Sequence, residues 1–328
     1  MIIILATGKY EKPEVVKSSY VLGTVINLRA YGRKAEKAVN EAIERLNYID
    51  DRMSVFKKDS DISKVNLKAG IDYEIVSKDT YEVVKNAVKY SKILEGTFDP
   101  TIRPLLKRWS IGTKEERIPE KNIIEETLKL VNYNDVVFDE KNKSIKLMHK
   151  NQALDVGGIA KGFAADQLRD IFYKNNIKSG LIDLGGNILV IGNKEDKTPW
   201  RVGIQNPFDS RGEYVGILAV ENKSVVTSGN YERYFMKNGK RYHHIIDPKT
   251  GYPSQSKIIS ATIISDNSID GDGLSTGVYI LGVNKAIDII EKIEGVDAIL
   301  ITEDKELYMT SGIRNSFNLT DDQFILRN

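Results

Sequence analysis

Apolar residues recur three or four positions apart in four stretches of the chain, which is the spacing of one face of an α-helix. The first two stretches are residues 33–53 and about 79–94. The third follows Gly162 and ends near residues 175–176, and the fourth runs from about residue 284 to Gly295. The pattern therefore predicts four amphipathic helices.

Shorter apolar runs lie between these stretches and predict β-strands. Residues 20–32 form one such run, and residues 135–148, 180–192 and 298–310 each place two runs around a short polar turn. Strands joined by tight turns pair antiparallel. The strict alternation of strand and helix that is typical of a doubly wound parallel sheet is missing. The predicted fold class is therefore α+β, with antiparallel sheets and flanking helices.

Composition narrows the range of partners and chemistries. The 328 residues are 41% hydrophobic and 29% charged, which is typical of soluble globular proteins. The 48 basic and 46 acidic residues are mixed along the chain, so no basic block indicates a nucleic-acid partner. Cysteine is absent, which excludes disulfides, thiolate chemistry and cysteine zinc sites.

The first residues differ from the rest because they show no periodic apolar face. The apolar run at residues 1–6 is too short to span a bilayer and has no basic flank, so it is not a complete signal peptide. We expect residues 1–19 to be a polar leader or the remnant of an export or anchor segment. Residues 20–328 are expected to form one catalytic domain, and no transmembrane segment is predicted.

Three nucleotide- or metal-binding motifs can be rejected. The glycine-rich stretch "DVGGIAKGFAAD" is not a Walker loop, because Lys161 is followed by Gly162 rather than by Ser or Thr. No G-x-G-x-x-G sequence follows a predicted strand, so a Rossmann dinucleotide site is not supported. The stretch that begins at Asp266 starts like an EF-hand loop, but its twelfth position is Gly277, where a bidentate Glu is required.

The same glycine-rich stretch suits a phosphorylated ligand. Gly157 and Gly158 allow the backbone to approach a ligand closely, and the helix that follows offers its N-terminus to an anion. Lys161 either neutralises a phosphate or is a surface lysine in a first helical turn. Its position alone does not decide between the two.

A second polar stretch, "DGDGLSTG", suits a hard metal ion. Asp272 and Thr276 are four residues apart, which places a carboxylate and a hydroxyl on one face of a helix. Such oxygens suit Mg²⁺, which favours few protein ligands together with substrate phosphate. The alternative is an N-terminal capping arrangement.

Two of the three histidines, His243 and His244, are adjacent and precede an Asp-Pro turn. Neighbouring residues of a strand point to opposite faces, so at most one of the two faces any given site. The alternative is a half-buried strand histidine beside an exposed one.

The order of these stretches resembles that of the ApbE family, the FAD:protein FMN transferases. The resemblance runs from about Tyr20 to the C-terminus and includes eight blocks. They are, in order, "YVLGT", "DRMSVFKKDSDISKVN", "GTFDPTIRPLLKRW", "DVGGIAKGFAADQL", "LIDLGGNILVIG", "VTSGNYERYF", "YHHIIDPKTGYP" and "DGDGLSTGVYILG". The resemblance implies an ApbE-like, T-fold-like architecture for residues 20–328.

The resemblance also implies an activity. Members of this family bind FAD and, with Mg²⁺, transfer its FMN half to a Thr or Ser hydroxyl of a target protein while AMP leaves. The expected acceptor is an electron-transfer flavoprotein, and the expected location is extracytoplasmic, membrane-associated in the full-length form. Two alternatives remain: a Mg²⁺-dependent pyrophosphatase that splits FAD into FMN and AMP, and a non-enzymatic flavin-binding protein.

Carried over by motif, the resemblance assigns roles to named residues. The residues implied to bind FAD are Leu22 (in place of the usual Met), Thr97, Phe98, Asp99, Asp155, Lys161 and Ile246. The implied Mg²⁺ ligands are the Gly158 carbonyl and the Asp272 and Thr276 side chains. Ser275 stands where some relatives carry a second acid. His244 is expected to face the site as the general base and His243 to face away.

Overall fold

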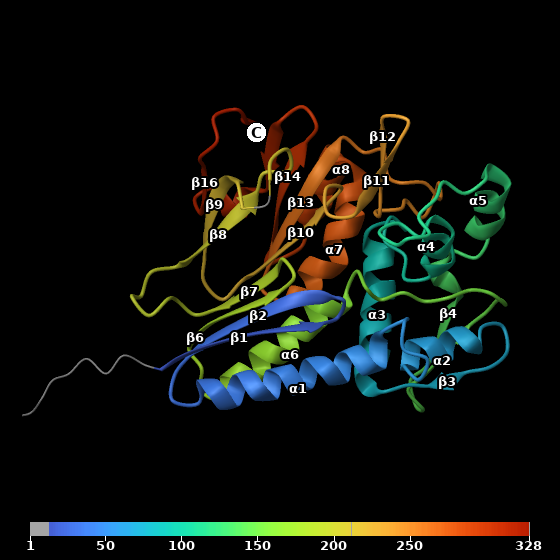
Figure 1. Ribbon diagram of the computed structural model, residues 1–328, viewed down its shortest axis with the longest axis horizontal. Coiled ribbons are helices and arrows are strands. Elements are labelled where there is room, and N and C mark those ends of the chain that lie inside the picture. The colour runs from blue at the N-terminus through green and yellow to red at the C-terminus, as the bar shows by residue number, and fades with distance from the viewer. Residues whose placement is uncertain (1–12, 211, 328) are drawn as a thin grey trace, which may run out of the picture.

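The computed structural model describes residues 13–210 and 212–327, and its main element is a nine-stranded sheet (Figure 1). All neighbouring strands are antiparallel except the last two, which are parallel. In spatial order the strands are β1 (Glu14–Val21), β2 (Thr24–Tyr31), β6 (Ser179–Leu184), β7 (Asn187–Ile191), β10 (Ser224–Gly229), β13 (Ile258–Ser265), β14 (Val296–Thr302), β15 (Glu306–Met309) and β17 (Ile325–Arg327). The α+β class with antiparallel sheets is confirmed.

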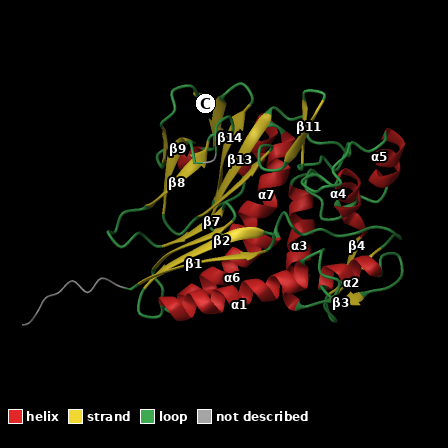
Figure 2. Ribbon diagram, in the orientation of Figure 1, coloured by secondary structure: helices red, strands yellow, loops and turns green. Residues whose placement is uncertain are grey.

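Four helices pack against this sheet and enclose the main hydrophobic core. They are α1 (Ala35–Met53), α6 (Ala160–Lys174), α7 (Ser268–Leu281) and α8 (Val283–Ile290). Helices α1 and α6 contact the strands at one end, and α7 contacts β10 and β13 near the middle (Figure 2). The face that α1 buries consists of apolar residues at helical spacing, including Val39, Leu46 and Ile49.

A second core contains side chains from the nine-stranded sheet and from a small three-stranded sheet. The small sheet contains β8 (Trp200–Gln205), β9 (Tyr214–Val220) and β16 (Phe317–Leu319). Trp200, Val202 and Leu218 are buried in one cluster with Val190 and Ile299 of the large sheet. The large sheet is therefore covered by different partners in different places.

The remaining elements lie beyond the C-terminal end of α1, on the right in Figure 1. They are α2 (Asp61–Leu67), β3 (Glu74–Ile75), α3 (Lys78–Ile93), α4 (Arg103–Trp109), α5 (Lys121–Leu128), β4 (Val136–Asp139) and β5 (Ser144–Leu147). Helix α3 contacts α7, which joins this part to the main core. The hairpin of β11 (Tyr234–Lys237) and β12 (Lys240–His243) packs against α4. The ring centres of Tyr242 and Trp109 lie 5.9 Å apart in a stacked arrangement.

The four predicted helices correspond to α1, α3, α6 and α8, and the three predicted hairpins are also present. The fourth helix is shorter than predicted. It ends at Ile290, because the chain turns through residues 291–295 to enter β14, with Gly295 at a φ of 74°. The strand predicted for residues 20–32 is confirmed as β2, but its first residues are not part of that strand: Leu22 and Gly23 both have positive φ and reverse the chain between β1 and β2.

The predicted boundary between leader and domain also needs correction. Strand β1 begins at Glu14 and pairs with β2 from Glu14 opposite Tyr31 to Val21 opposite Thr24. Residues 14–19 therefore belong to the sheet, where hydrogen bonds to β2 hold them in place. The rest of the predicted leader, residues 1–12, lies outside the described residues. Over residues 13–210 and 212–327, none of the helices combines the length and apolar character needed to cross a membrane.

Candidate active site

The centre of the candidate site is the crossing of α6 and α7. A side-chain carbon at Gly162 would lie 2.3 Å from the Ser268 carbonyl oxygen and 2.7 Å from Cβ of Asp272, so only glycine permits this approach. The Gly162 N–H donates to the Asp272 carboxylate at 2.9 Å. The first turn of α6 thus donates a backbone N–H that has no partner within the helix to an anion. The anion is a side chain of α7, whereas the sequence predicts a phosphorylated ligand.

Lys161 adds an ion pair to the contact between Gly162 and Asp272. Its Nζ lies 3.1 Å from a carboxylate oxygen of Asp272 and 3.4 Å from the Gly157 carbonyl oxygen. The Asp272 side chain is 4% exposed and that of Lys161 is 27% exposed. The pair is therefore closed on the aspartate side and open to solvent on the lysine side.

The three predicted metal ligands lie close together. Asp272 and Thr276 are one turn apart on α7. A side-chain carbon at Gly158 would lie 3.9 Å from Oγ1 of Thr276 and 3.1 Å from the ring of Phe98. Within the described residues no group of three or more His, Asp or Glu side chains is placed to hold a metal ion. The available set is one carboxylate, one hydroxyl and backbone carbonyl oxygen, which suits a cation that keeps water and phosphate ligands.

Two serines adjoin this set. The Ser228 hydroxyl at the end of β10 donates to Ser275 at 2.9 Å and lies 3.4 Å from Oγ1 of Thr276. Ser275 itself is buried and donates to the Asp272 carbonyl oxygen. The position where some relatives carry a second acid is thus occupied by a neutral, hydrogen-bonded hydroxyl.

The predicted flavin-binding stretch at residues 97–99 reaches the site through its first two residues. The Thr97 hydroxyl lies 3.1 Å from the Gly277 carbonyl oxygen of α7, and the Phe98 ring lies against Gly158. The Asp99 carboxylate is instead used within its own loop, where it accepts hydrogen bonds from the Thr101 backbone and hydroxyl and from the Tyr133 N–H. Burial raises the pKa of Asp99, and these hydrogen bonds oppose the rise.

Asp155 connects the same loop to the glycine-rich stretch. Its backbone N–H donates to the Pro100 carbonyl oxygen at 2.7 Å. One carboxylate oxygen accepts the Gly157 N–H at 2.9 Å, and the other accepts from the Arg103 guanidinium at 3.1 Å. Asp155 therefore orients the backbone just before Gly158 and Lys161.

The two adjacent histidines lie in different environments, as predicted. His243, at the end of β12, is 5% exposed, with Nε2 3.0 Å from the Ser254 carbonyl oxygen and its ring edge against Tyr279. His244 is only partly buried, and its Nδ1 lies 3.2 Å from the Arg233 carbonyl oxygen. A carbonyl oxygen can only accept, so this contact places the proton on Nδ1 and leaves Nε2 with its lone pair.

The electrostatic surroundings keep His244 neutral. The partial burial of the ring, and then the positive charge of Arg233, lower its pKa to about 4. A neutral imidazole with a free Nε2 is able to accept a proton.

The other two predicted flavin-binding residues, Leu22 and Ile246, make contacts of their own. Leu22 is in the turn between β1 and β2, with a φ of 54°, next to the turn between β6 and β7. Ile246 is buried with Leu105, Trp109 and Ile124, in the short segment that follows His244. The contacts of the described residues do not join either side chain to the Lys161–Asp272 pair.

Residues 22–300 match the ApbE family, which is most of the chain. The chain belongs to the ApbE family. The family assignment made from the sequence blocks is confirmed.

Curated relatives and solved structures agree with this assignment. A protein of Klebsiella pneumoniae named FAD:protein FMN transferase is 33% identical, over 93% of this chain and 94% of its own. One of the same name from Treponema pallidum is 31% identical, over 97% and 93%. The crystal structure of the ApbE protein of Thermotoga maritima superposes with a TM-score of 0.85 at 30% identity, covering 93% of this chain and 99% of the other. The flavin transferase ApbE of Vibrio cholerae gives a TM-score of 0.84 at 25% identity, with the same coverage.

Sequence reasoning missed several residues that shape this family member's site. Ser228 and Arg103 each stand in a quoted block, yet neither has a spacing that marks it as functional. Arg233 and Asp247 also stand in quoted blocks. Asp247 caps its own turn through the Lys249 N–H at 2.8 Å, and Arg233 supplies a carbonyl oxygen and a positive charge to His244.

Proposed function

We propose that this protein transfers the FMN half of FAD to a Thr or Ser hydroxyl of an acceptor protein, with Mg²⁺, and releases AMP. Membership of the ApbE family and relatives named FAD:protein FMN transferase at 31–33% identity support flavin transferase activity. The observation that supports the finer proposal most directly is the Lys161–Asp272 pair one helical turn from Thr276, and the neutral His244 would supply the base.

The reaction requires one bond to form and one to break. The acceptor hydroxyl oxygen bonds to the phosphorus of the FMN half, and the bond from that phosphorus to the bridging oxygen breaks. AMP leaves with the bridging oxygen, and the hydroxyl proton goes to Nε2 of His244. The low pKa of His244 would rise once the negative pyrophosphate lies nearby, which makes the imidazole a stronger base when substrate is bound.

Lys161 and the backbone around Gly157 and Gly158 would hold the pyrophosphate. The Lys161 side chain is 27% exposed and its ammonium group already faces a carboxylate, so the group can move to a phosphate oxygen with little rearrangement. The glycines allow the backbone to approach the phosphates, and Asp155 fixes their orientation through the Gly157 N–H. These groups position the reacting phosphorus rather than react themselves.

The residues at the α6–α7 crossing fit Mg²⁺. A buried carboxylate that is already held by a positive charge, with a hydroxyl one helical turn away, is a suitable pair of hard oxygen ligands. Asp272, Thr276 and the Gly158 carbonyl would hold the ion. When bound, Mg²⁺ neutralises the charge of the phosphate oxygens.

The proposal extends to the acceptor and to the location of the protein. By family resemblance we propose an electron-transfer flavoprotein as acceptor and an extracytoplasmic location, membrane-associated in the full-length form. A chain without cysteine is compatible with an oxidising compartment.

One experiment separates this function from its alternatives. The protein is incubated with FAD, Mg²⁺ and a candidate electron-transfer flavoprotein, and the acceptor mass and the released nucleotides are measured. Transferase activity predicts an acceptor heavier by one FMN less one water, with one AMP released for each transfer. Free FMN and AMP with an unmodified acceptor would indicate a pyrophosphatase. Bound, intact FAD without AMP would indicate a non-enzymatic flavin-binding protein.

A further inference from the structure

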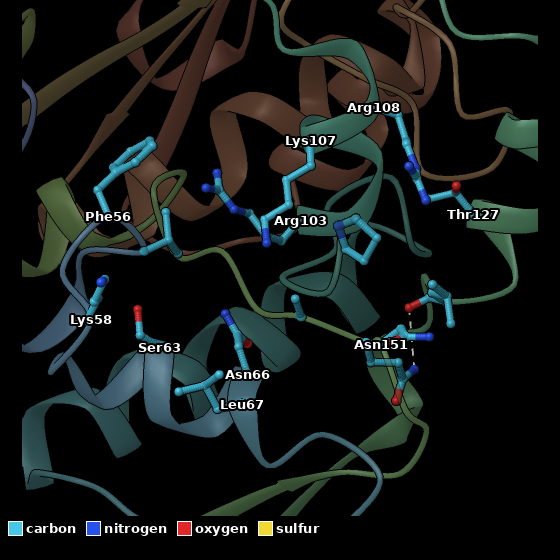
Figure 3. Close-up of a pocket in the computed structure, with 15 residues that line it drawn as sticks. Phe56, Lys58, Ser63, Asn66, Leu67, Arg103, Lys107, Arg108, Thr127 and Asn151 are labelled. Atoms are coloured by element: carbon cyan, nitrogen blue, oxygen red, sulfur yellow. Dashed lines mark hydrogen bonds between the residues drawn. The ribbon is translucent and has the colours of Figure 1, made fainter.

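A pocket of about 830 Å³ lies beside the site, between α2, α4 and residues 151–153 (Figure 3). Of the described residues that line it, four are cationic and none is acidic. The cations are Lys58 from the loop after α1 and Arg103, Lys107 and Arg108 from α4. In Figure 3, Lys107 extends from α4 toward the floor formed by α2.

Most of this positive charge is unpaired. Arg103 forms an ion pair with Asp155. Among the residues that the structure describes, no carboxylate lies within 4.0 Å of the charged groups of Lys58, Lys107 or Arg108. Like charges gathered on one concave surface create a positive potential that attracts an anionic partner.

The edges of the pocket are apolar. Phe56 is 84% exposed and Leu67 is 75% exposed, and both line the pocket. The Arg103 guanidinium carbon lies 5.0 Å from the centre of the Phe56 ring. Exposed aromatic and aliphatic side chains next to arginine are typical of the anchor points in protein–protein interfaces.

We propose that this pocket docks an acidic segment of the acceptor protein, with glutamate or aspartate on the cations and an apolar side chain on Phe56 or Leu67. The inference rests on the proposed transferase function. The cations are spread over a loop and a helix rather than focused on one point, which suits an extended peptide better than a single phosphate. The Arg103–Asp155 pair joins the pocket to the Gly157 backbone, so a segment held here lies next to the proposed pyrophosphate site.

The test uses a charge reversal that leaves the proposed catalytic groups unchanged. Lys107→Glu/Arg108→Glu alters two exposed residues of α4. The probe is a fluorescein-labelled peptide containing glutamates and a leucine, with a glutamine counterpart as its control. We expect the wild-type protein to bind the glutamate peptide, and the reversal to weaken this binding at least about tenfold, the equivalent of losing roughly 1.4 kcal/mol. FAD affinity, measured by titration, should stay unchanged.

A matched control separates local from global charge. Arg33→Glu/Lys34→Glu makes the same change in net charge at the exposed start of α1. This position is one helix length, roughly 28 Å, from the α1 end that leads to the pocket. Peptide binding should change less than about twofold in the control. Should the reversal not fold, Lys107→Gln/Arg108→Gln removes the charges without placing acids at the end of α4.

Three outcomes would overturn the inference. Equal binding of the glutamine peptide would show that the pocket does not recognise acidic residues. Equal losses in the control and the α4 variant would assign the effect to net charge. A loss of FAD affinity in the α4 variant would place the pocket in the flavin site. Peptide binding requires no transfer, so intact binding without transfer would contradict only the proposed function.

Discussion

The crossing of α6 and α7 is buried and closely packed, whereas the β11–β12 hairpin that leads to His244 is largely exposed. At the crossing, Gly162 and Asp272 approach so closely that one added carbon has no room. At the hairpin tip, a carbon added to Gly239 would meet nothing within 4 Å. The proposed site thus combines a rigid half that would hold metal and phosphate with an adaptable half that carries the base. Exposed segments adjust more readily than packed ones, so we expect the hairpin half to be the one that adapts to the proposed acceptor.

The largest effect of a substitution in the rigid half is expected at Asp272. We expect Asp272→Ala to abolish transfer and to lower the free energy of unfolding by about 1–3 kcal/mol, because Gly162 N–H and Lys161 lose their acceptor. Asp272→Asn keeps an acceptor for Gly162 and should regain most of the stability but little of the activity. Urea denaturation and acceptor mass measure the two effects. Chelator-sensitive transfer at near-normal rates in Asp272→Ala would show that other residues bind the metal.

Substitutions of the two adjacent histidines compare a proposed catalytic side chain with a buried structural one. His244→Ala should reduce transfer by roughly 10²–10⁴-fold while stability and FAD affinity change little, because the side chain is partly exposed and acts as a base. His243→Ala should do the opposite, since it empties a buried position against Tyr279. Steady-state rates and thermal denaturation of both variants give the answer. Equal losses of activity would refute the assignment of the base.

Two glycine substitutions compare the packing of the two halves directly. Gly162→Ala should cost about 1–3 kcal/mol of stability or prevent folding, because its new carbon would press on the Ser268 carbonyl. Gly239→Ala has free space, and its cost should be about 1 kcal/mol, from the positive φ of 73° alone. Chemical denaturation measures the difference. A smaller cost at Gly162 than at Gly239 would mean that the crossing is not rigid.

The last prediction leaves the sequence unchanged and concerns a pH dependence of stability that arises at His244. Its folded pKa of about 4 lies below the ordinary 6.5, so the unfolded chain binds the proton more readily between these values. This contribution to stability is therefore full above about pH 6.5 and is lost as the pH falls toward 4. Burial also lowers the pKa of His243, which adds a loss of the same sign.

Thermal denaturation at neutral and mildly acidic pH, with His244→Gln as the control, tests this effect. The variant should lose less stability on acidification than the parent. An identical pH dependence in the two proteins would remove His244 from the explanation.

The sequence alone determined the features that depend on neighbouring residues. Helical spacing located α1, α3 and α6 closely, and alternating runs around polar turns located three hairpins. Local spacing also placed Asp272 and Thr276 on one helical face and the two histidines on opposite sides of the chain. The order of the blocks was sufficient to assign the family, which no single motif could do.

Only the tertiary structure decided contacts between distant segments. Lys161 and Asp272 are 111 positions apart, and no local pattern encodes their pairing or the glycine that permits it. Strand β1 lacks a helical or strongly apolar pattern and is held by its ladder with β2, which is why residues 14–19 read as a polar leader. The Asp99 carboxylate resembled a ligand group in sequence, but burial and the Tyr133 N–H commit it to its own loop. Periodicity records which face of an element is buried, whereas the partner that buries it is set by the packing of the whole chain.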